Sequence, residues 1–211
     1  MISEGGDVSD EELYKRLQAG EEAAFRELLH RYHARLGGLA RIFLDDAAAV
    51  EEVVQETWLA ALEGLNGLEN PASLRAWLFR ILANKARRRA ARDKRMASLS
   101  VLFEPEEAGE PAVDPDRFTR RGFWAVQVSL WDELDPERIV AGRQLWALMR
   151  EAIEQLAPAQ RAVVLLRDME GLEPSQVCEI LEISDANRRV LLHRARARLR
   201  REIEALLEAE R

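Results

Sequence analysis

The chain has 211 residues, of which 47% are hydrophobic and 33% are charged, a composition typical of a folded globular protein. Five carboxylates among the first twenty residues argue against a secretory or transit signal, and no apolar run is long enough to span a membrane. We therefore expect a cytoplasmic protein without membrane insertion. The single cysteine, Cys178, and three histidines are too few for a disulfide framework or a zinc cluster, so we expect no metal or other cofactor.

The formal net charge is −7, but the charges are segregated along the chain. Residues 42–70 contain seven acidic residues and no Lys or Arg, and residues 104–116 contain six acidic residues and no base. Residues 85–95 contain seven basic residues, and residues 188–201 contain seven arginines with His193 and no acid. Because binding depends on local fields and not on the total charge, the two basic segments are candidates for nucleic-acid contacts.

Apolar residues recur at helical spacing and no alternating run is long enough for a strand, so the sequence predicts an all-α fold. A first helix begins at a capping box formed by Ser9 and Glu12, and the break at Gly20 fits either two short helices or one kinked helix. A longer helix is predicted from Asp46, with a loop over residues 64–71. The next helix begins at Pro71 and closes a first domain over residues 8–95. The apolar positions that define these helices are Leu13, Leu17, Phe25, Leu28, Leu29, Val50, Val53, Val54, Thr57, Ala61, Leu62, Leu65, Leu74, Trp77, Leu78, Ile81 and Leu82.

Residues 96–135 are predicted to be a linker, because the periodicity fades and three prolines accompany the acidic run. Its later part is more aromatic than a freely solvated tether requires, and we expect it to dock on a surface. A second helical domain is predicted over residues 136–207. Asp135 and Pro136 begin its first helix, Pro158 begins another that ends at Gly171, and Pro174 opens a short helix.

The short helix predicted over residues 174–181 and the basic helix over residues 185–201 are joined by a turn of three or four residues. This is the layout of a helix-turn-helix, whose second helix enters the major groove. Arginine neutralises phosphates there and donates two hydrogen bonds to guanine. The alternative, an amphipathic surface helix with a solvated basic face, fits less well because the seven arginines stand without an acid.

The other basic segment, residues 85–95, continues a helix whose upstream turns carry Trp77, Phe79, Arg80 and Asn84. These side chains offer stacking surfaces and hydrogen-bond donors of the kind that hold unpaired bases. A solvated helix end is the alternative, since cations are favourable near a helix C-terminus. Trp77 also lies on the apolar stripe of its helix, which favours a core position.

The acidic helix presents Glu52, Gln55, Glu56 and Glu63 at spacings of three and four, which places them on one face. A solvated face is the simplest interpretation. Paired carboxylates also invite general acid catalysis, but no positioned histidine, cysteine or glycine-rich phosphate loop accompanies them. We therefore predict that the protein is not an enzyme.

Three parts of the chain resemble, in order, the extracytoplasmic-function sigma factors of the sigma-70 family, over about two thirds of the sequence. Glu52-Val-Val-Gln-Glu-Thr-Trp-Leu59 resembles the region that grips the clamp coiled coil of the polymerase largest subunit. Ala76-Trp-Leu-Phe-Arg-Ile81, followed by Asn84, Lys85 and Ala86, resembles the region that reads the minus-ten element. Leu156-Ala-Pro-Ala-Gln-Arg161, Leu165-Leu-Arg-Asp-Met-Glu-Gly-Leu172 and His193-Arg-Ala-Arg-Ala-Arg-Leu199 resemble the domain that reads the minus-thirty-five element.

The resemblance implies a transcription initiation factor that binds core RNA polymerase and directs promoter recognition and DNA melting, with domains corresponding to sigma regions 2 and 4. It implies contacts with the clamp of the largest subunit, the flap of the second-largest subunit, duplex and melted promoter DNA, and an anti-sigma factor. The implied polymerase contacts are Glu52, Gln55 and Glu56. The implied minus-ten contacts are Asn66, Asn70, Ser73, Arg80, Asn84, Lys85, Arg87 and Arg88. In the recognition helix, Arg189, Val190, His193 and Arg194 are expected at base edges, and Arg188, Arg196 and Arg198 at phosphates.

The recognition helix departs from the family pattern. Members commonly have Thr-Val-Lys-Ser-Arg-Leu where this chain reads Asn187-Arg-Arg-Val-Leu-Leu192, so that an arginine replaces the usual buried valine. Two other functions remain open at this point. One is a free-standing helix-turn-helix regulator that binds duplex operators as a dimer without polymerase. The other is a helical scaffold or anti-factor that binds only proteins, which leaves the two arginine-rich surfaces without a role.

Overall fold

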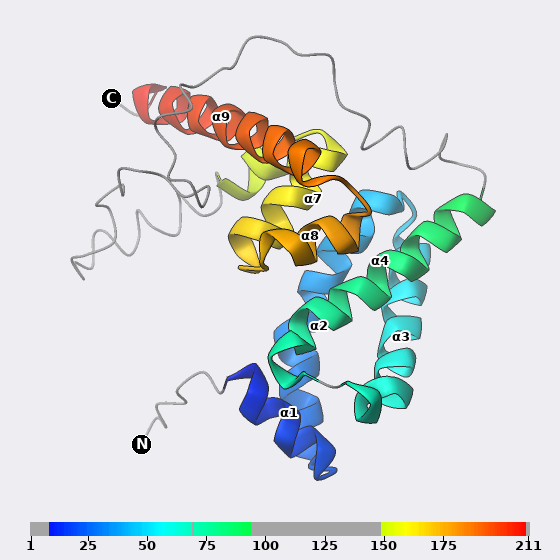
Figure 1. Cartoon of the computed structure of the whole chain (residues 1–211). Helices are drawn as coiled ribbons and strands as arrows, with labels where there is room; N and C mark the ends of the chain where they lie inside the picture. Colours follow the sequence, from blue (N-terminus) through cyan, green and yellow to red (C-terminus); the bar gives the residue numbers. More distant parts are fainter. Residues whose placement is uncertain (1–8, 69, 94–148, 210–211) are drawn as a thin grey trace. The chain divides into compact units, whose positions relative to one another are not determined.

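The computed structural model describes residues 9–68, 70–93 and 149–209, and it describes side chains up to residue 202. All the regular elements in these ranges are helices, which confirms the predicted all-α fold (Figure 1). Of these residues, those up to 93 and residues 175–182 form one compact unit, and residues 149–174 and 183–209 form a second. The predicted linker, and the predicted helix start at Asp135, lie outside the described residues.

The N-terminal part of the first unit consists of two separate helices. Helix α1 (Asp10–Gln18) begins at Ser9, whose Oγ accepts a hydrogen bond from the backbone N–H of Glu12 at 3.2 Å. This is the capping interaction that the sequence predicts. Helix α2 (Glu22–Phe43) follows after Gly20. It extends well beyond Phe25, Leu28 and Leu29, the apolar positions from which the sequence predicts it. Its buried face continues through Tyr32, Leu36, Leu39, Ala40, Ile42 and Phe43.

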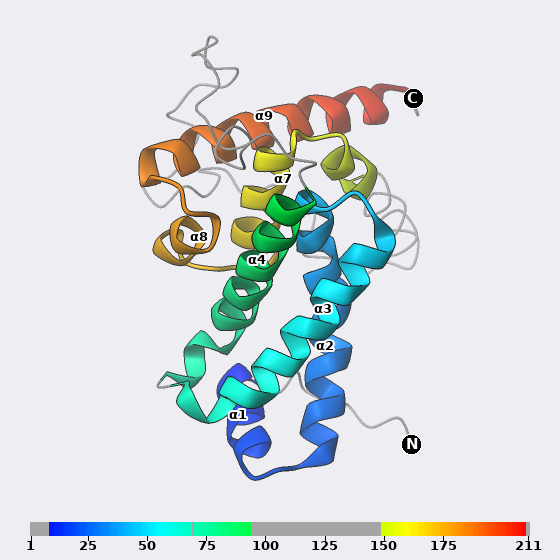
Figure 2. The same cartoon turned by 90° about the vertical axis from the view of Figure 1, so that its right-hand side faces the viewer.

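Two further helices follow in the same unit. Asp46 caps α3 (Ala47–Gly64) through hydrogen bonds from the backbone N–H groups of Ala48 and Ala49, at 3.4 and 3.2 Å. The chain then forms two short 3-10 turns, η1 (Leu65–Gly67) and η2 (Pro71–Ser73), before α4 (Leu74–Arg92). Helices α2 and α3 lie side by side, α4 packs on both, and α1 packs on α2 and η2 (Figure 2).

The buried arc of α4 differs from the predicted one. Phe79, which the sequence suggests as a stacking surface for bases, is completely buried, whereas Trp77 and Ile81 are only half-buried. Because α4 packs on both α2 and α3, its buried arc is wide enough to include Phe79 and Ala83. The predicted apolar positions Leu29 and Leu62 are likewise 40% and 49% exposed, and they are not part of the core.

The break between α1 and α2 depends on the backbone conformation of Gly20. Its φ of +76° lies in the left-handed region, and a Cβ there would meet no atom within 4 Å, so only backbone strain opposes a side chain. We expect Gly20→Ala to lower the free energy of unfolding by about 1 to 2 kcal/mol in urea denaturation. Gly67→Ala is the matched control, because Gly67 also has open space but no positive φ. Equal losses from the two variants would contradict this explanation.

The second half of the described chain begins with a helical segment at residues 149–154. Helix α7 (Pro158–Val164) continues into a π-helical turn, η4 (Leu165–Met169), and Gly171 follows with φ +67°, as predicted for a left-handed helix end. In the predicted helix-turn-helix, the short helix α8 (Pro174–Leu181) has the predicted bounds, and the long helix α9 (Asp185–Ala209) begins where predicted and continues beyond residue 201. Within the second unit, α7 packs against α9.

Candidate polymerase and nucleic-acid interfaces

The acidic face of α3 is accessible to solvent. Glu52 and Gln55 are exposed, and the Glu56 side chain is 40% exposed. The Gln55 Nε2 donates to Glu51 Oε1 at 3.2 Å, a contact between two exposed side chains of the same helix. The three predicted polymerase contacts therefore share one accessible helix face.

Glu52 and Glu56 also pair with basic residues of α4. The Lys85 Nζ lies 3.5 Å from Glu56 Oε2, and Arg89 is paired with Glu52. Arg89 also contacts Asp93, with its Nε 3.0 Å from the Asp93 Oδ2, and hydrogen bonds from Arg89 to Asp93 and Glu52 raise the pKa of its guanidinium. The sequence predicts separate acidic and basic surfaces, whereas the structure joins them along the α3–α4 seam. Solvent-exposed pairs of this kind are worth roughly 0 to 1 kcal/mol, so a stronger partner can replace them.

Four more of the predicted minus-ten contacts lie along one side of α4, next to Lys85. Arg80 and Arg88 are exposed, and Asn84 and Arg87 are half-buried, at spacings of three to four residues. The Arg87 Nη2 donates to Asn84 Oδ1 at 2.6 Å, which orients the amide and the guanidinium together. This face combines two exposed cations with an oriented amide.

The loop before α4, comprising residues 65–73, carries the other predicted minus-ten contacts. Asn66 lies in η1 and is exposed. Asn70 caps η2, because its Oδ1 accepts the backbone N–H of Ala72 at 3.1 Å, and it is also exposed. Ser73 is half-buried at the end of η2. The loop therefore presents two asparagines to solvent immediately before the basic face of α4.

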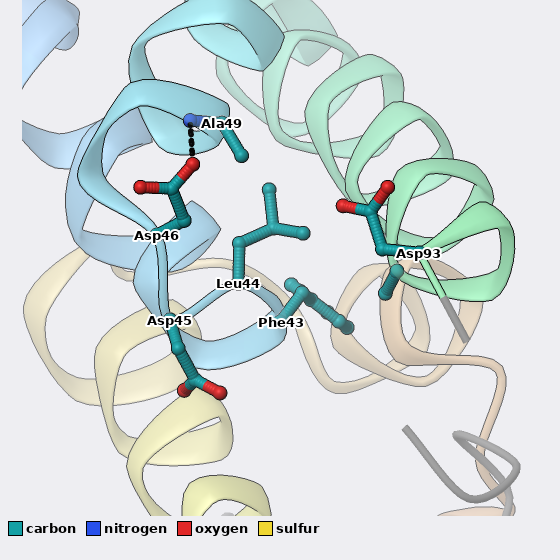
Figure 3. A pocket seen from close by; sticks show the side chains of 7 residues that line it. Phe43, Leu44, Asp45, Asp46, Ala49 and Asp93 are labelled. Carbon is teal, nitrogen blue, oxygen red and sulfur yellow. Dashed lines mark hydrogen bonds between the residues drawn. The ribbon is translucent and has the colours of Figure 1, made fainter. Parts of the chain in front are cut away.

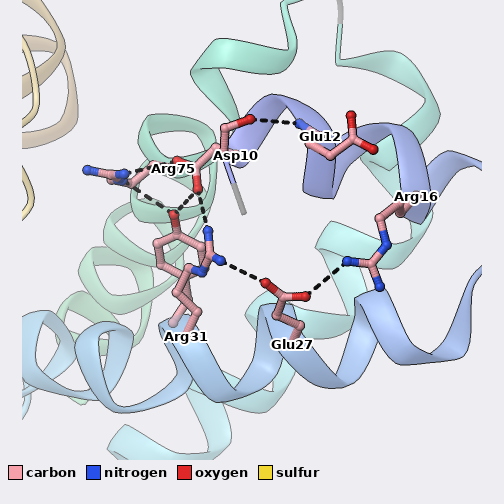
Figure 4. Close-up of polar contacts among 8 residues, drawn as sticks. Asp10, Glu12, Arg16, Glu27, Arg31 and Arg75 are labelled. Atoms are coloured by element: carbon pink, nitrogen blue, oxygen red, sulfur yellow. Dashed lines mark hydrogen bonds and ion pairs between the residues drawn. The ribbon is translucent and has the colours of Figure 1, made fainter. Parts of the chain in front are cut away.

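A polar network that the sequence analysis missed connects α1, α2 and α4 (Figure 4). Asp10 accepts hydrogen bonds from the Tyr32 hydroxyl at 2.7 Å and from Arg31 at 3.2 Å, and it pairs with Arg75 at 3.1 Å. Burial, and then the hydrogen bond to Asp10, raise the pKa of Tyr32 to about 12. In the sequence, Asp10, Arg31 and Arg75 resemble ordinary solvated charges. The one signal of this network would have been a buried Tyr32, because its hydroxyl needs a polar partner.

The recognition helix α9 presents a continuous face of predicted base contacts. Arg189 is exposed, Val190 is 41% exposed, and His193 and Arg194 are half-buried. Their spacing of one, three and one residues keeps them on the same side of the helix. The exposed valine adds an apolar group to this basic face, and apolar side chains can contact thymine methyls in a major groove. Arg198 is half-buried further along the helix.

Two predicted phosphate contacts are placed differently from the expectation. Arg188 and Arg196 are both only 8% exposed. The Arg188 Nε donates to Asp185 Oδ1 at 3.0 Å, and this hydrogen bond is the largest influence that lowers the pKa of Asp185. The Arg196 Nε donates to Asp168 Oδ2 in η4 at 2.9 Å. Both guanidiniums are therefore occupied by carboxylates within the second half of the chain, and Arg188 keeps a buried position where the family has valine.

A small pocket lies where the α2–α3 turn meets the end of α4 (Figure 3). Its lining includes Phe43 and Leu44 together with Asp45, Asp46 and Asp93. Asp46 is engaged in capping α3 and Asp93 contacts Arg89, so the pocket offers no converging set of ligands.

Among residues 9–68, 70–93 and 149–202, no group of three histidine, cysteine or acidic side chains is arranged to hold a metal ion. In the same part of the chain, no helix has the length and apolarity needed to cross a membrane.

Comparisons with known proteins match two separate parts of the chain. The family model described as sigma-70 region 2 matches residues 28–96, and the one described as sigma-70, region 4 matches residues 146–199. The RNA polymerase sigma-H factor of Pseudomonas aeruginosa is 27% identical over 199 residues, which are 94% of this chain and 95% of that protein. The ECF RNA polymerase sigma-E factor of Escherichia coli K12 is 24% identical over 200 residues, which are 95% of this chain and 97% of that protein.

Among solved structures, the sigma factor RpoE from Bartonella quintana, in complex with the anti-sigma factor NepR, is 19% identical. The alignment covers 85% of this chain and 96% of that one, with a TM-score of 0.49. The region 2 match covers most of α2 together with α3 and α4, a set of helices that neither a free-standing regulator nor a scaffold requires. The chain belongs to the sigma-70 family and is an extracytoplasmic-function sigma factor, a transcription initiation factor that recognises promoters.

Proposed function

We propose that the chain binds core RNA polymerase through the acidic face of α3 and that Glu52, Gln55 and Glu56 contact the clamp coiled coil of the largest subunit. The support is the accessibility of these three side chains on one helix face whose charge is unsuited to DNA. A second contact, between the domain over residues 136–207 and the flap of the second-largest subunit, follows from the sigma family. An anti-sigma factor as inhibitor, and a cytoplasmic location beside the polymerase, are proposed on the same ground.

The minus-ten element is proposed to be read as melted single strand by the loop at residues 65–73 and the basic face of α4. The observation that carries this proposal is the sequence of exposed asparagines followed directly by an exposed cationic helix face. Amide groups recognise the edges of an extruded base, and cations hold the strand that carries it. The proposed contacts are Asn66, Asn70, Ser73, Arg80, Asn84, Lys85, Arg87 and Arg88.

The minus-thirty-five element is proposed to be read as duplex by α9. Arg189, Val190, His193 and Arg194 are the proposed base contacts, and Arg198 is proposed at a phosphate. For Arg188 and Arg196 we propose that they act first within the protein. The Arg196–Asp168 pair ties α9 to η4, and the Arg188–Asp185 pair lies within the first turn of α9, so that any phosphate contact they make is secondary.

Selection from a randomised promoter library by polymerase reconstituted with the full chain tests this assignment. We expect Arg189→Ala/Val190→Ala to relax base preference in the minus-thirty-five element only. We expect Asn66→Ala/Asn70→Ala to relax base preference in the minus-ten element only. A lost base contact is expected to reduce discrimination by about tenfold at the affected position. Selection of one symmetric duplex site by the chain without polymerase would contradict the proposal.

A further inference from the structure

Tyr14 of α1 is buried, and its hydroxyl lies against the backbone of the loop at residues 65–73. The hydroxyl oxygen is 2.9 Å from the carbonyl oxygen of Leu68 and 3.2 Å from that of Leu65, and it accepts a hydrogen bond from Gln18 Nε2 at 2.9 Å. Because Gln18 supplies a donor, the single hydroxyl proton is available to the two carbonyls. These carbonyls bracket Asn66 and Gly67, so one side chain of α1 holds the backbone on both sides of the first exposed asparagine.

Helix α1 also holds the far end of the same loop. Asp10 pairs with Arg75, which lies in the first turn of α4, two residues after Ser73 (Figure 4). The same carboxylate accepts from the buried Tyr32 hydroxyl of α2, which ties this end to the core. Helix α1 packs against η2 between these two attachments. The loop is therefore fixed at its beginning by Tyr14 and at its end by Asp10.

We propose that Tyr14 is a positioning residue for minus-ten recognition: it fixes the backbone around Asn66 and Gly67 and so sets base preference without touching DNA. The proposal rests on the proposed role of the loop at residues 65–73. The physical reason is that base-edge recognition depends on donor and acceptor positions, and a loop free to shift spreads the Asn66 amide over several positions. Leu65 anchors the same turn through its buried side chain, so loss of the hydroxyl loosens the loop without releasing it.

The test uses Tyr14→Phe, which removes only the hydroxyl, in the full chain reconstituted with core polymerase. We expect discrimination at one or more minus-ten positions of the randomised library to fall about fivefold to tenfold, the equivalent of one hydrogen bond. Minus-thirty-five preference and polymerase affinity are expected to stay unchanged. Ser9→Ala is the matched control, because it removes the cap of α1 and lowers the stability of the same helix while leaving the Tyr14 hydroxyl in place.

The variants separate this proposal from the function on which it rests. If Asn66→Ala/Asn70→Ala relaxes minus-ten preference and Tyr14→Phe does not, the loop reads DNA and the positioning role is overturned. If Ser9→Ala relaxes preference as much as Tyr14→Phe, Tyr14 is merely structural and the proposal is also overturned. If the asparagine variant has no effect, the loop does not read the minus-ten element, and the proposed function of the loop falls together with the role of Tyr14.

Discussion

Phe79→Ala is expected to lower the free energy of unfolding by about 3 to 5 kcal/mol, the largest loss of stability among the variants considered. Phe79 is completely buried on α4, a helix that packs on both α2 and α3, so removal of its ring leaves a cavity among close-packed side chains. Urea denaturation followed by far-UV circular dichroism measures the change. Phe79→Leu retains most of the apolar volume and is expected to cost less than half as much.

The comparison with Trp77 makes this prediction specific. Trp77 is half-buried beside Gly64, where a Cβ on the glycine would lie 3.1 Å from the indole ring. Trp77→Ala is therefore expected to destabilise the protein less than Phe79→Ala, although tryptophan is the larger residue. A Phe79→Ala variant that keeps full stability but no longer melts promoter DNA would contradict the buried position and support a stacking role for this ring.

The fold was predictable where the signal is local. Ser9 and Asp46 begin helices because their side chains accept backbone N–H groups two or three residues ahead. Gly20 and Gly171 end helices because their positive φ angles suit a residue without a Cβ. The spacing of Glu52, Gln55 and Glu56 likewise defines one face of α3 without knowledge of any partner. Each of these features depends on residues within one or two helical turns.

The candidate site was less predictable where it depends on distant partners. Arg196 looks solvated in the sequence, but Asp168, 28 residues away, occupies its guanidinium. The acidic and basic segments look independent, but Lys85 meets Glu56 across the α3–α4 seam. Tyr14 shows no sign of its contact with the Leu68 carbonyl, 54 residues away, because helical periodicity predicts which face is buried but not which backbone it meets.

The second large effect is expected in polymerase binding. Gln55→Ala/Glu56→Ala removes two accessible polar groups from the proposed clamp-binding face and is expected to weaken the complex with core polymerase about tenfold or more. The loss is expected to lie in the contact itself, because Gln55 is exposed and the ion pair of Glu56 with Lys85 is part-exposed. The stability of the isolated chain is expected to change by less than about 1 kcal/mol.

Two controls separate this effect from general damage. Lys85→Ala breaks the same ion pair as Glu56→Ala but leaves the carboxylate available, so it is expected to retain polymerase binding. Glu11→Ala removes an exposed carboxylate from α1, outside the proposed face, and is also expected to have no effect. Equal weakening by Lys85→Ala would indicate that the seam between α3 and α4, and not the acidic face, is what polymerase requires.

Co-elution of the purified full chain with core RNA polymerase in size-exclusion chromatography tests the central claim most directly. The claim predicts a stable complex that Gln55→Ala/Glu56→Ala weakens and that Lys85→Ala and Glu11→Ala leave intact. A folded, inhibitor-free chain that forms no complex with the core enzyme would contradict the claim that this protein initiates transcription as a polymerase subunit.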